Sequence, residues 1–174
     1  MRAAIILSIL FLTVFATQSC RSGTSEPPES TQGDLRTAAV ATLDALVADL
    51  VAERPADSAA YAERLRVYLE ANPAFYGSAV ALLDEADTVT DCPYVYRTSE
   101  GYDTIYLATP AYNIEGQDWF MMPLEANAGI WTSPYFDAGG GEIWMITRSV
   151  PARDDKGVFA IVTTDLPVDP PEKE

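Results

Sequence analysis

The chain has 174 residues and a formal net charge of −15, from 11 basic and 26 acidic side chains, and it contains no histidine. This charge disfavours binding to nucleic acids, and the lack of histidine excludes the catalytic triads that use it and the commonest zinc ligand. Once a leader and a linker are set aside, the length allows one domain.

The first 19 residues are predicted to be a secretory signal peptide. Arg2 precedes an apolar run over residues 3–16, which carries no charge and is short for a membrane span. Small Ser19 and then Cys20 follow this run. The pattern indicates export from the cytoplasm.

The end of this leader resembles the lipobox of bacterial lipoproteins. Thr17-Gln18-Ser19-Cys20 fits the pattern except at Thr17, where an aliphatic residue is usual. The resemblance implies that Cys20 is acylated and anchors the protein to the outer face of a bacterial membrane, in the periplasm or at the cell surface. Ordinary cleavage without acylation and an uncleaved N-terminal anchor are the alternatives, and both also place the domain outside the cytoplasm.

Residues 20–33 are expected to be the acylated cysteine and a disordered tether. Residues 21–33 are polar, contain two prolines and show no apolar periodicity, so they lack the surface needed for a core. Acylation of Cys20 would leave Cys92 as an unpaired thiol.

Two helices are predicted at the start of the domain, which spans 34–168. The first covers 35–53, with Asp34 as its N-cap and Pro55 beyond its end. The second covers 59–71 and ends at Asn72, which precedes a proline. Their apolar faces consist of Ala39, Leu43, Leu46 and Leu50 in the first helix and of Tyr61, Leu65, Tyr68 and Leu69 in the second.

Strands are predicted after the helices, where β-branched and aromatic runs alternate with Gly, Asp and Pro. The turn chemistry of residues 154–157 predicts a hairpin between the last two runs. Helices followed by strands indicate an α+β domain with a mostly antiparallel sheet, and residues 169–174 form a tail. The predicted strands are 77–83, 94–98, 104–109, 142–149 and 158–164.

The segment from Asp118 to Asp165 resembles the membrane-distal half of Cache sensor domains, which have a PAS-like sheet behind a long N-terminal helix. The motifs that carry the resemblance are Trp119-Phe120, Trp131-Thr132-Ser133-Pro134-Tyr135-Phe136-Asp137, Pro151, and Gly157 before a strand that ends at Asp165. The resemblance implies recognition of a small metabolite in a pocket between the sheet and its covering loops. It says nothing of enzymatic activity, and no cofactor is expected.

The resemblance also implies which residues contact the ligand. Tyr112, Trp119, Phe120, Tyr135 and Asp165 match the spacing of members that bind amino acids, whereas Gln117 stands where those members have an arginine. A glutamine amide lacks the two charge-assisted bonds with which arginine holds an α-carboxylate. The remaining aromatic residues, together with Trp131, Asp137 and Asp165, favour an amine or another small polar metabolite.

Other interpretations of these residues stay open. The aromatic side chains can belong to the core. Asp137 can cap the turn into Gly139–Gly141, and Asp165 can end a strand by bonding its own backbone. The glycines lack the lysine of a phosphate-binding loop and the alternating acids of a calcium loop, so no metal site is predicted.

Three functions compete. The preferred one is an exported binding module that senses or captures a ligand and acts through a membrane signalling or transport protein. The alternative is a structural lipoprotein that docks such a partner without a ligand, for which a pocket filled by bulky side chains would be evidence. A hydrolase with a carboxylate pair is the third, but no pair stands out among the acids, so the protein is not expected to be an enzyme.

Overall fold

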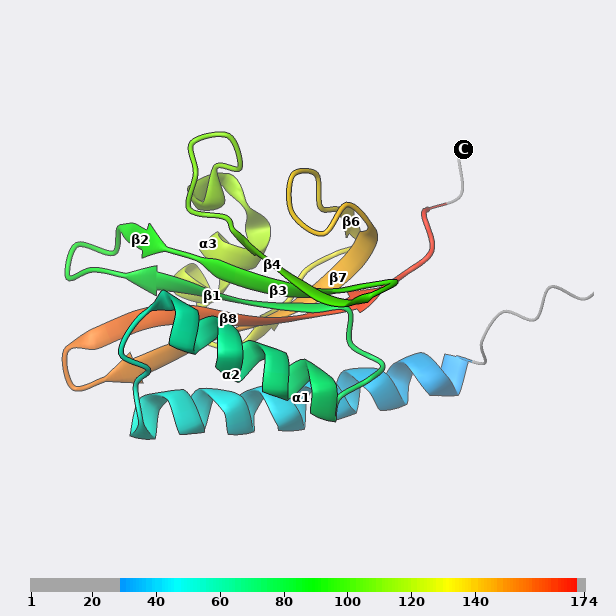
Figure 1. The fold of residues 1–174 in the computed structure, drawn as a ribbon, viewed down its shortest axis with the longest axis horizontal. Coiled ribbons are helices and arrows are strands. Elements are labelled where there is room, and N and C mark those ends of the chain that lie inside the picture. The colour runs from blue at the N-terminus through cyan, green and yellow to red at the C-terminus, as the bar shows by residue number, and fades with distance from the viewer. Residues whose placement is uncertain (1–28, 172–174) are drawn as a thin grey trace, which may run out of the picture.

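The structure, a computed structural model, describes residues 29–171 (Figure 1). The predicted signal peptide, Cys20 and the start of the tether lie outside these residues. The helices are α1 (Glu29–Ala52), α2 (Ser58–Ala71), the short 3-10 helix η1 (Ile114–Gly116) and α3 (Asp118–Ala126). The strands are β1 (Gly77–Leu83), β2 (Val89–Asp91), β3 (Pro93–Thr98), β4 (Gly101–Tyr106), β5 (Ile130–Trp131), β6 (Tyr135–Phe136), β7 (Trp144–Asp154) and β8 (Gly157–Pro167).

Both predicted N-terminal helices are present, and α1 begins earlier than expected. It starts at Glu29, so residues 29–33 are helical rather than a disordered tether, and Asp34 lies inside the helix rather than at its N-cap. Once the buried face from Ala39 onward holds the helix, each added N-terminal residue gains a backbone bond at little cost. The boundaries of α2 are confirmed, because Asp57 accepts a hydrogen bond from the backbone N of Ala60 at 2.9 Å.

The eight strands form one antiparallel sheet with the order β4-β3-β1-β8-β7-β5, in which β2 pairs with β1 and β6 with β7. The predicted strand 77–83 is confirmed as β1, and the hairpin turn is confirmed by the pairing of Asp154 with Gly157. The strand expected at 104–109 instead occupies 101–106, because the turn after β3 brings Gly101 directly opposite Thr98.

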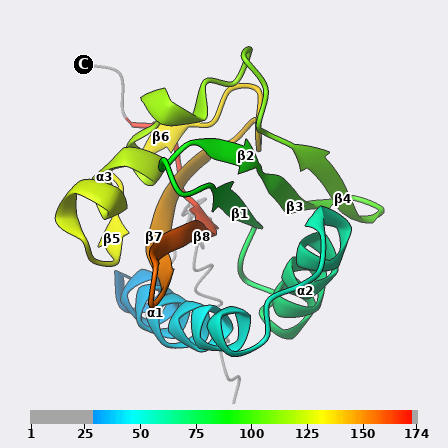
Figure 2. The same cartoon turned by 90° about the vertical axis from the view of Figure 1, so that its left-hand side faces the viewer.

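Helices cover both faces of the sheet. Because the sheet is antiparallel and the helices do not alternate with its strands, the fold is α+β, as expected. Figure 2 shows α1 and α2 side by side on one face of the curved sheet and α3 on the other. The first face buries a core that includes Leu43, Leu65 and Val162, and the second buries a smaller cluster that includes Tyr94 and Phe120. The α3 face is the one that carries the candidate site.

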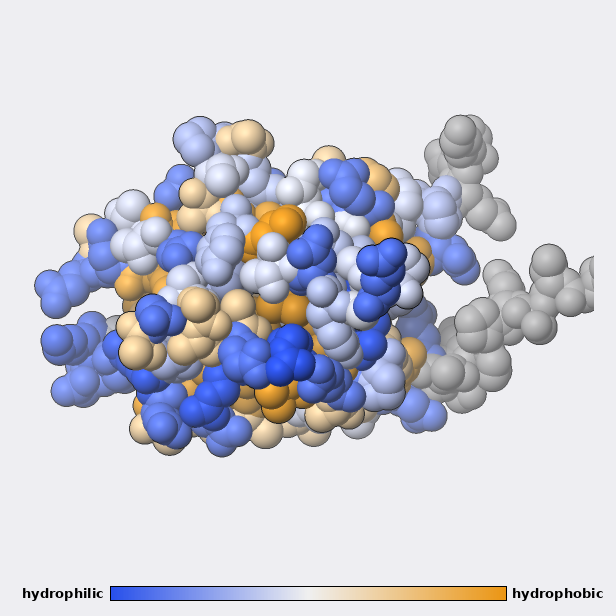
Figure 3. All heavy atoms as spheres, in the orientation of Figure 1, coloured by the Kyte–Doolittle hydropathy of each residue, from blue (hydrophilic) through white to orange (hydrophobic). Residues whose placement is uncertain are grey.

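The surface is mainly hydrophilic over the face drawn in Figure 3, with apolar stretches between the helices and the sheet. The four ion pairs within residues 29–171 all involve partly or fully exposed side chains, so each contributes little to stability. No helix in the described range has the length and apolar character needed to cross a membrane.

Candidate ligand-binding site

The floor of the site consists of side chains that strand alternation places on the α3 face of the sheet. They are Ala79 on β1, Tyr94 on β3, Thr147 on β7, and Thr163 and Asp165 on β8. Ala79 lies opposite Tyr94 across the strand pair, and Thr147 lies opposite Asp165. All five residues are buried, although three of them are polar or charged. Such burial is unusual unless the groups have partners.

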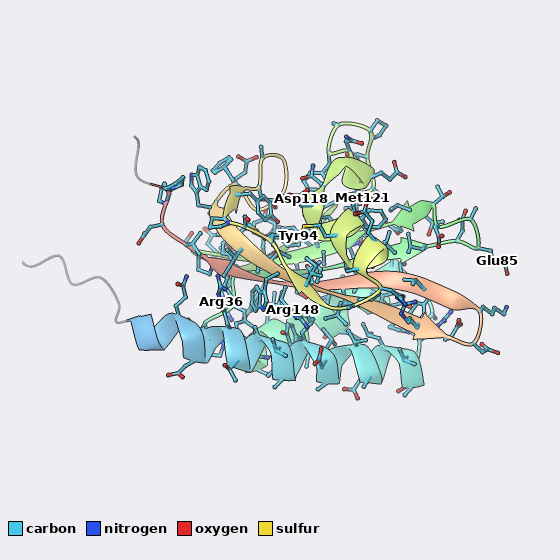
Figure 4. The ribbon with its side chains drawn as sticks, turned by 180° about the vertical axis from the view of Figure 1, so that it is seen from behind. Arg36, Glu85, Tyr94, Asp118, Met121 and Arg148 are labelled. Atoms are coloured by element: carbon cyan, nitrogen blue, oxygen red, sulfur yellow. The ribbon has the colours of Figure 1, made fainter. Side chains whose placement is uncertain are left out.

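The cover over this floor comes from the chain between β4 and β7. It contributes Leu107, Tyr112, Trp119 on α3, Tyr135 on β6 and Asp137. In Figure 4, Tyr94 and Asp118, the first residue of α3, both lie on the side of the sheet that faces away from α1. The cover thus brings aromatic rings and a second carboxylate over the floor.

Hydrogen bonds tie the parts of the cover together. The hydroxyl of Tyr112 donates to Oδ1 of Asp137 at 2.5 Å, and Nε1 of Trp119 donates to the hydroxyl of Tyr112 at 3.2 Å. The side-chain amide of Gln117 donates to the backbone carbonyl of Tyr112 at 3.1 Å. Gln117 therefore supports the position of Tyr112 at the site.

Asp137 serves the turn that follows it as well as the site. Its Oδ2 accepts a hydrogen bond from the backbone N of Gly141 at 2.6 Å, so the interpretation of Asp137 as the cap of the glycine turn is confirmed. A side chain at Gly140 would collide with the same carboxylate. The two oxygens of Asp137 thus hold the turn on one side and Tyr112 on the other.

Asp165 is at the end of a chain of hydroxyl groups. Thr147 donates its Oγ1 hydrogen to Oδ1 of Asp165 at 2.8 Å, and the hydroxyl of Tyr135 lies 2.8 Å from the same Oγ1. A threonine hydroxyl has one hydrogen to donate, so Tyr135 must be the donor to Thr147. Asp165 bonds Thr147 on the neighbouring strand rather than its own backbone.

Burial raises the proton affinity of both carboxylates. Burial and the charge of Asp137 raise the pKa of Asp165 to about 7, against the hydrogen bond from Thr147 and the nearby hydroxyl of Tyr94. Burial also raises the pKa of Asp137, although bonds from Tyr112 and Gly141 oppose the change. Neither carboxylate belongs to an ion pair within residues 29–171.

Tyr94 brings an unused hydrogen-bonding group to the same place. Its hydroxyl is buried beside the carboxylate of Asp165, but it makes no hydrogen bond of good geometry among the described residues. Burial and the charges of Asp165 and Asp137 raise its pKa, so it stays protonated and able to donate. A buried hydroxyl without a partner costs free energy, and a bound ligand could relieve that cost.

The space between floor and cover is small. The inner cavity has a volume of about 10 Å³, which is room for about one water molecule. Trp119 and Tyr135 separate it from an outer hollow of about 220 Å³, which Gly116, Gln117 and Asp118 also line. The two rings therefore form a wall between the outer hollow and the buried carboxylates.

The structure brings together most of the residues proposed from the sequence, but not all of them. Tyr112, Trp119, Tyr135, Asp137 and Asp165 surround the inner cavity, and Gln117 lies at the outer hollow.

Phe120 and Trp131 lie apart from the cavity. Phe120 packs edge-on against Trp119, with ring centroids 6.0 Å apart, and belongs to the core beneath α3. Trp131 packs against the core on the α1 side, where the guanidinium of Arg36 lies 5.3 Å from its ring centroid. The short strand β5 turns Trp131 to the face opposite the site, which corrects its assignment to the pocket.

Sequence reasoning missed the contribution of the strands to the site. Tyr94, Thr147 and Thr163 line the cavity but do not belong to the motif of the covering segment. The signal was the alternation of each strand: Tyr94 shares its face with Cys92 and Tyr96, and Asp165 shares its face with Thr163. Finding these residues also required the register between strands, which the sequence does not state.

The described residues include no group of three or more His, Cys, Asp or Glu side chains that could hold a metal ion. The lining of the inner cavity offers two carboxylates, the hydroxyl of Tyr94 and several aromatic rings.

Comparisons with known proteins agree with this architecture. The family model of the first PDC sensor domain of methyl-accepting chemotaxis protein-like proteins matches residues 61–170. No curated protein sequence matches the chain significantly.

Three solved structures illustrate the similarity. The extracellular domain soHK1S-Z6, assigned to a histidine kinase, is 28% identical with a TM-score of 0.61, over 79% of this chain and 55% of that one. The ligand-binding domain of the Campylobacter jejuni chemoreceptor Tlp3, in complex with L-valine, is 18% identical with a TM-score of 0.63, over 79% and 54%. The domain of the Pseudomonas aeruginosa amino acid chemoreceptor PctC, in complex with GABA, is 17% identical with a TM-score of 0.56, over 77% and 57%.

The chain spans little more than half the length of each of these structures. The family model covers more than half of this chain, and the solved structures share its helices and antiparallel sheet. The chain therefore belongs to the family of PDC sensor domains, which are Cache-type domains of chemoreceptors and histidine kinases.

Proposed function

We propose that this domain is an extracytoplasmic sensor module that binds a small cationic amine between Asp165, Asp137 and the rings of Trp119 and Tyr135. The observation that carries the proposal is the pair of buried carboxylates that line one cavity without a basic partner in the described chain. An ammonium group would supply the missing charge, and the aromatic faces would attract it further.

Gln117 supports an amine over an α-amino acid. It occupies the place of the arginine that would clamp a carboxylate, and it donates one of its two amide hydrogens to the carbonyl of Tyr112. The structural neighbours Tlp3 and PctC are complexed with L-valine and GABA, and both of these ligands carry an amino group. We therefore propose that this site binds the amino group that these ligands share, and that it does not bind their carboxylate.

Entry of an amine requires the cover to move. The inner cavity of about 10 Å³ is too small for a ligand of several heavy atoms, so Trp119 and Tyr135 must rotate or shift outward. This movement would change the outer surface around α3, which is how occupancy can be read by a partner. We propose that the partner is a membrane signalling or transport protein.

We also propose that Cys20 carries the lipid that keeps the domain at the membrane. Expression of the full chain in a bacterial host with a labelled fatty acid should label the wild type and not Cys20→Ser. Equal labelling of both proteins, or of neither, would count against the anchor.

A ligand panel tests the binding function. Thermal unfolding of the purified protein would be followed with amines, amino acids, carboxylates and sugars. A ligand at about 100 times its Kd adds about 2.7 kcal/mol to the unfolding free energy, which raises the Tm by several degrees. We expect shifts confined to amines, and a panel in which carboxylates or sugars alone shift the Tm would contradict the proposal.

The small cavity favours one alternative, a lipoprotein that docks a membrane partner without a ligand. Tyr112, Trp119 and Tyr135 fill the space that a ligand would need. In that case no member of the panel would shift the Tm of a well-folded sample. The unpartnered hydroxyl of Tyr94 is the observation that favours ligand binding over this alternative.

A further inference from the structure

The site has two compartments that share one aromatic wall. Trp119 and Tyr135 line both the inner cavity and the outer hollow. The inner compartment contains the carboxylates of Asp137 and Asp165, and the outer one is lined by the exposed carboxylate of Asp118. A chain that passed between the two rings would therefore have carboxylates at both ends.

All three acidic side chains lie close enough to Tyr135 for their charges to affect its hydroxyl. After burial, the charges of Asp165, Asp137 and Asp118 each raise the pKa of its hydroxyl. None of these three carboxylates takes part in an ion pair within residues 29–171. The wall between the compartments is thus surrounded by negative charge that the chain does not neutralise.

The inner compartment also has a group directed at a ligand. Tyr94 lines the cavity and is only 2% exposed, and its hydroxyl makes no hydrogen bond of good geometry in the described chain. This hydroxyl is a neutral group beside Asp165, and its unused bonding capacity marks the inner compartment as a place where something polar binds.

We infer that the ligand is a linear diamine, with one ammonium group between Asp165 and Asp137 and the other at Asp118, and with its methylene chain between Trp119 and Tyr135. The inference rests on the proposed function and narrows it. Apolar methylenes suit the ring faces, and each ammonium group meets a carboxylate. A monoamine of the same length would leave Asp118 without a partner.

The test compares putrescine with n-butylamine, which has the same carbon chain and one ammonium group. Affinities would be measured by calorimetry in low salt for the wild type, Asp118→Asn and Glu115→Gln. Glu115 is a matched control, because it is an exposed acid three residues earlier that lines a different hollow. Both positions are exposed, so both variants should fold, and their Tm values would confirm it.

We expect putrescine to bind the wild type about five- to tenfold more tightly than n-butylamine, because an exposed ion pair adds to the twofold statistical advantage of two equivalent ends. In Asp118→Asn the ratio should fall to about twofold, while Glu115→Gln should keep the wild-type ratio. Added salt should reduce the ratio in the wild type.

Three results would overturn the inference in different ways. If n-butylamine binds and putrescine gains no more than the statistical factor, the diamine is wrong and the amine site stands. If putrescine keeps its gain in Asp118→Asn, the placement of the second ammonium group at Asp118 is wrong, and the inference fails as stated. If neither amine binds the wild type, the proposed function itself fails, and the diamine fails with it.

Discussion

The hydroxyl of Tyr94 lies where a side chain on Gly77 would begin. A Cβ atom at Gly77 would collide with the hydroxyl oxygen and with the adjoining ring carbons of Tyr94. Gly77 also lies opposite Asp165 across strands β1 and β8. The absence of a side chain at Gly77 therefore gives Tyr94 its place beside the carboxylate.

Replacement of Gly77 by alanine should disturb this arrangement. The added methyl group has to push the ring of Tyr94 aside in a buried sheet, and such overpacking costs about 1–3 kcal/mol. Chemical denaturation would measure the loss. Gly33→Ala is the control, because nothing lies within 4 Å of its Cβ position, and on helix α1 it should be neutral or stabilising. Equal stabilities of the two variants would show that Tyr94 does not need the space.

Tyr94→Phe should stabilise the ligand-free protein while it weakens amine binding. The substitution removes a buried hydroxyl that lacks a partner, so we expect a gain of about 1 kcal/mol in unfolding free energy. Tyr76→Phe makes the opposite comparison, because it removes a hydroxyl that donates to the carbonyl of Gly141 at 2.7 Å and should lose about 1 kcal/mol. A loss of stability in Tyr94→Phe would mean that the hydroxyl is satisfied.

The sequence was sufficient for the elements whose periodicity is strong. The strand at 77–83 and the second helix were predicted almost to the residue, because apolar spacing and flanking Asp or Pro residues mark them. The segment 114–136 was harder, because η1, α3, β5 and β6 are each too short to show a period. Their positions depend on packing against β7 and β8 rather than on local preference.

The dependence on packing and strand register also explains which residues of the candidate site were predicted and which were missed. Tyr112 and Asp165 were predicted because they match the residue spacing of the Cache motif along the chain. Tyr94 was not, because only the register of β3 on β1 brings it to Asp165. Trp131 was assigned to the pocket because it belongs to the same motif as Tyr135, but β5 and β6 pair with β7 at separate places and direct the two rings to opposite faces.

Gln117→Arg should change which ligands bind. A guanidinium at the outer hollow can bind a carboxylate with two charge-assisted bonds, which the amide of Gln117 cannot do. We expect α-amino acids to raise the Tm of the variant and not that of the wild type. Gln117→Glu, which offers no donor for a carboxylate, is the control. If Gln117→Arg binds the same ligands as the wild type, this position does not determine which ligand binds.

Amine affinity should depend on pH through Asp165. Burial and the charge of Asp137 raise the pKa of Asp165 to about 7, whereas an alkylammonium group stays charged to about pH 10. The carboxylate form binds the amine, so affinity should rise about tenfold between about pH 6 and about pH 8. Calorimetry across this range would measure the slope, and a flat profile would refute the role of Asp165.

The stability of the ligand-free protein should follow the opposite course. The pKa of Asp165 is higher in the folded state than in the unfolded chain, so the folded state binds the extra proton between about pH 4 and about pH 7. The contribution of Asp165 to the unfolding free energy therefore declines as pH rises through this window.

The most direct test of the site is calorimetric titration of n-butylamine and of n-butanol into the wild type, Asp165→Asn and Asp155→Asn. Butanol has the same chain without the charge, and Asp155 is an exposed acid in the β7–β8 turn, remote from the cavity lining. We expect the wild type and Asp155→Asn to bind the amine more than about tenfold more tightly than the alcohol, and Asp165→Asn to lose that preference. Undiminished amine binding by a folded Asp165→Asn would contradict the proposed role of Asp165 in the site.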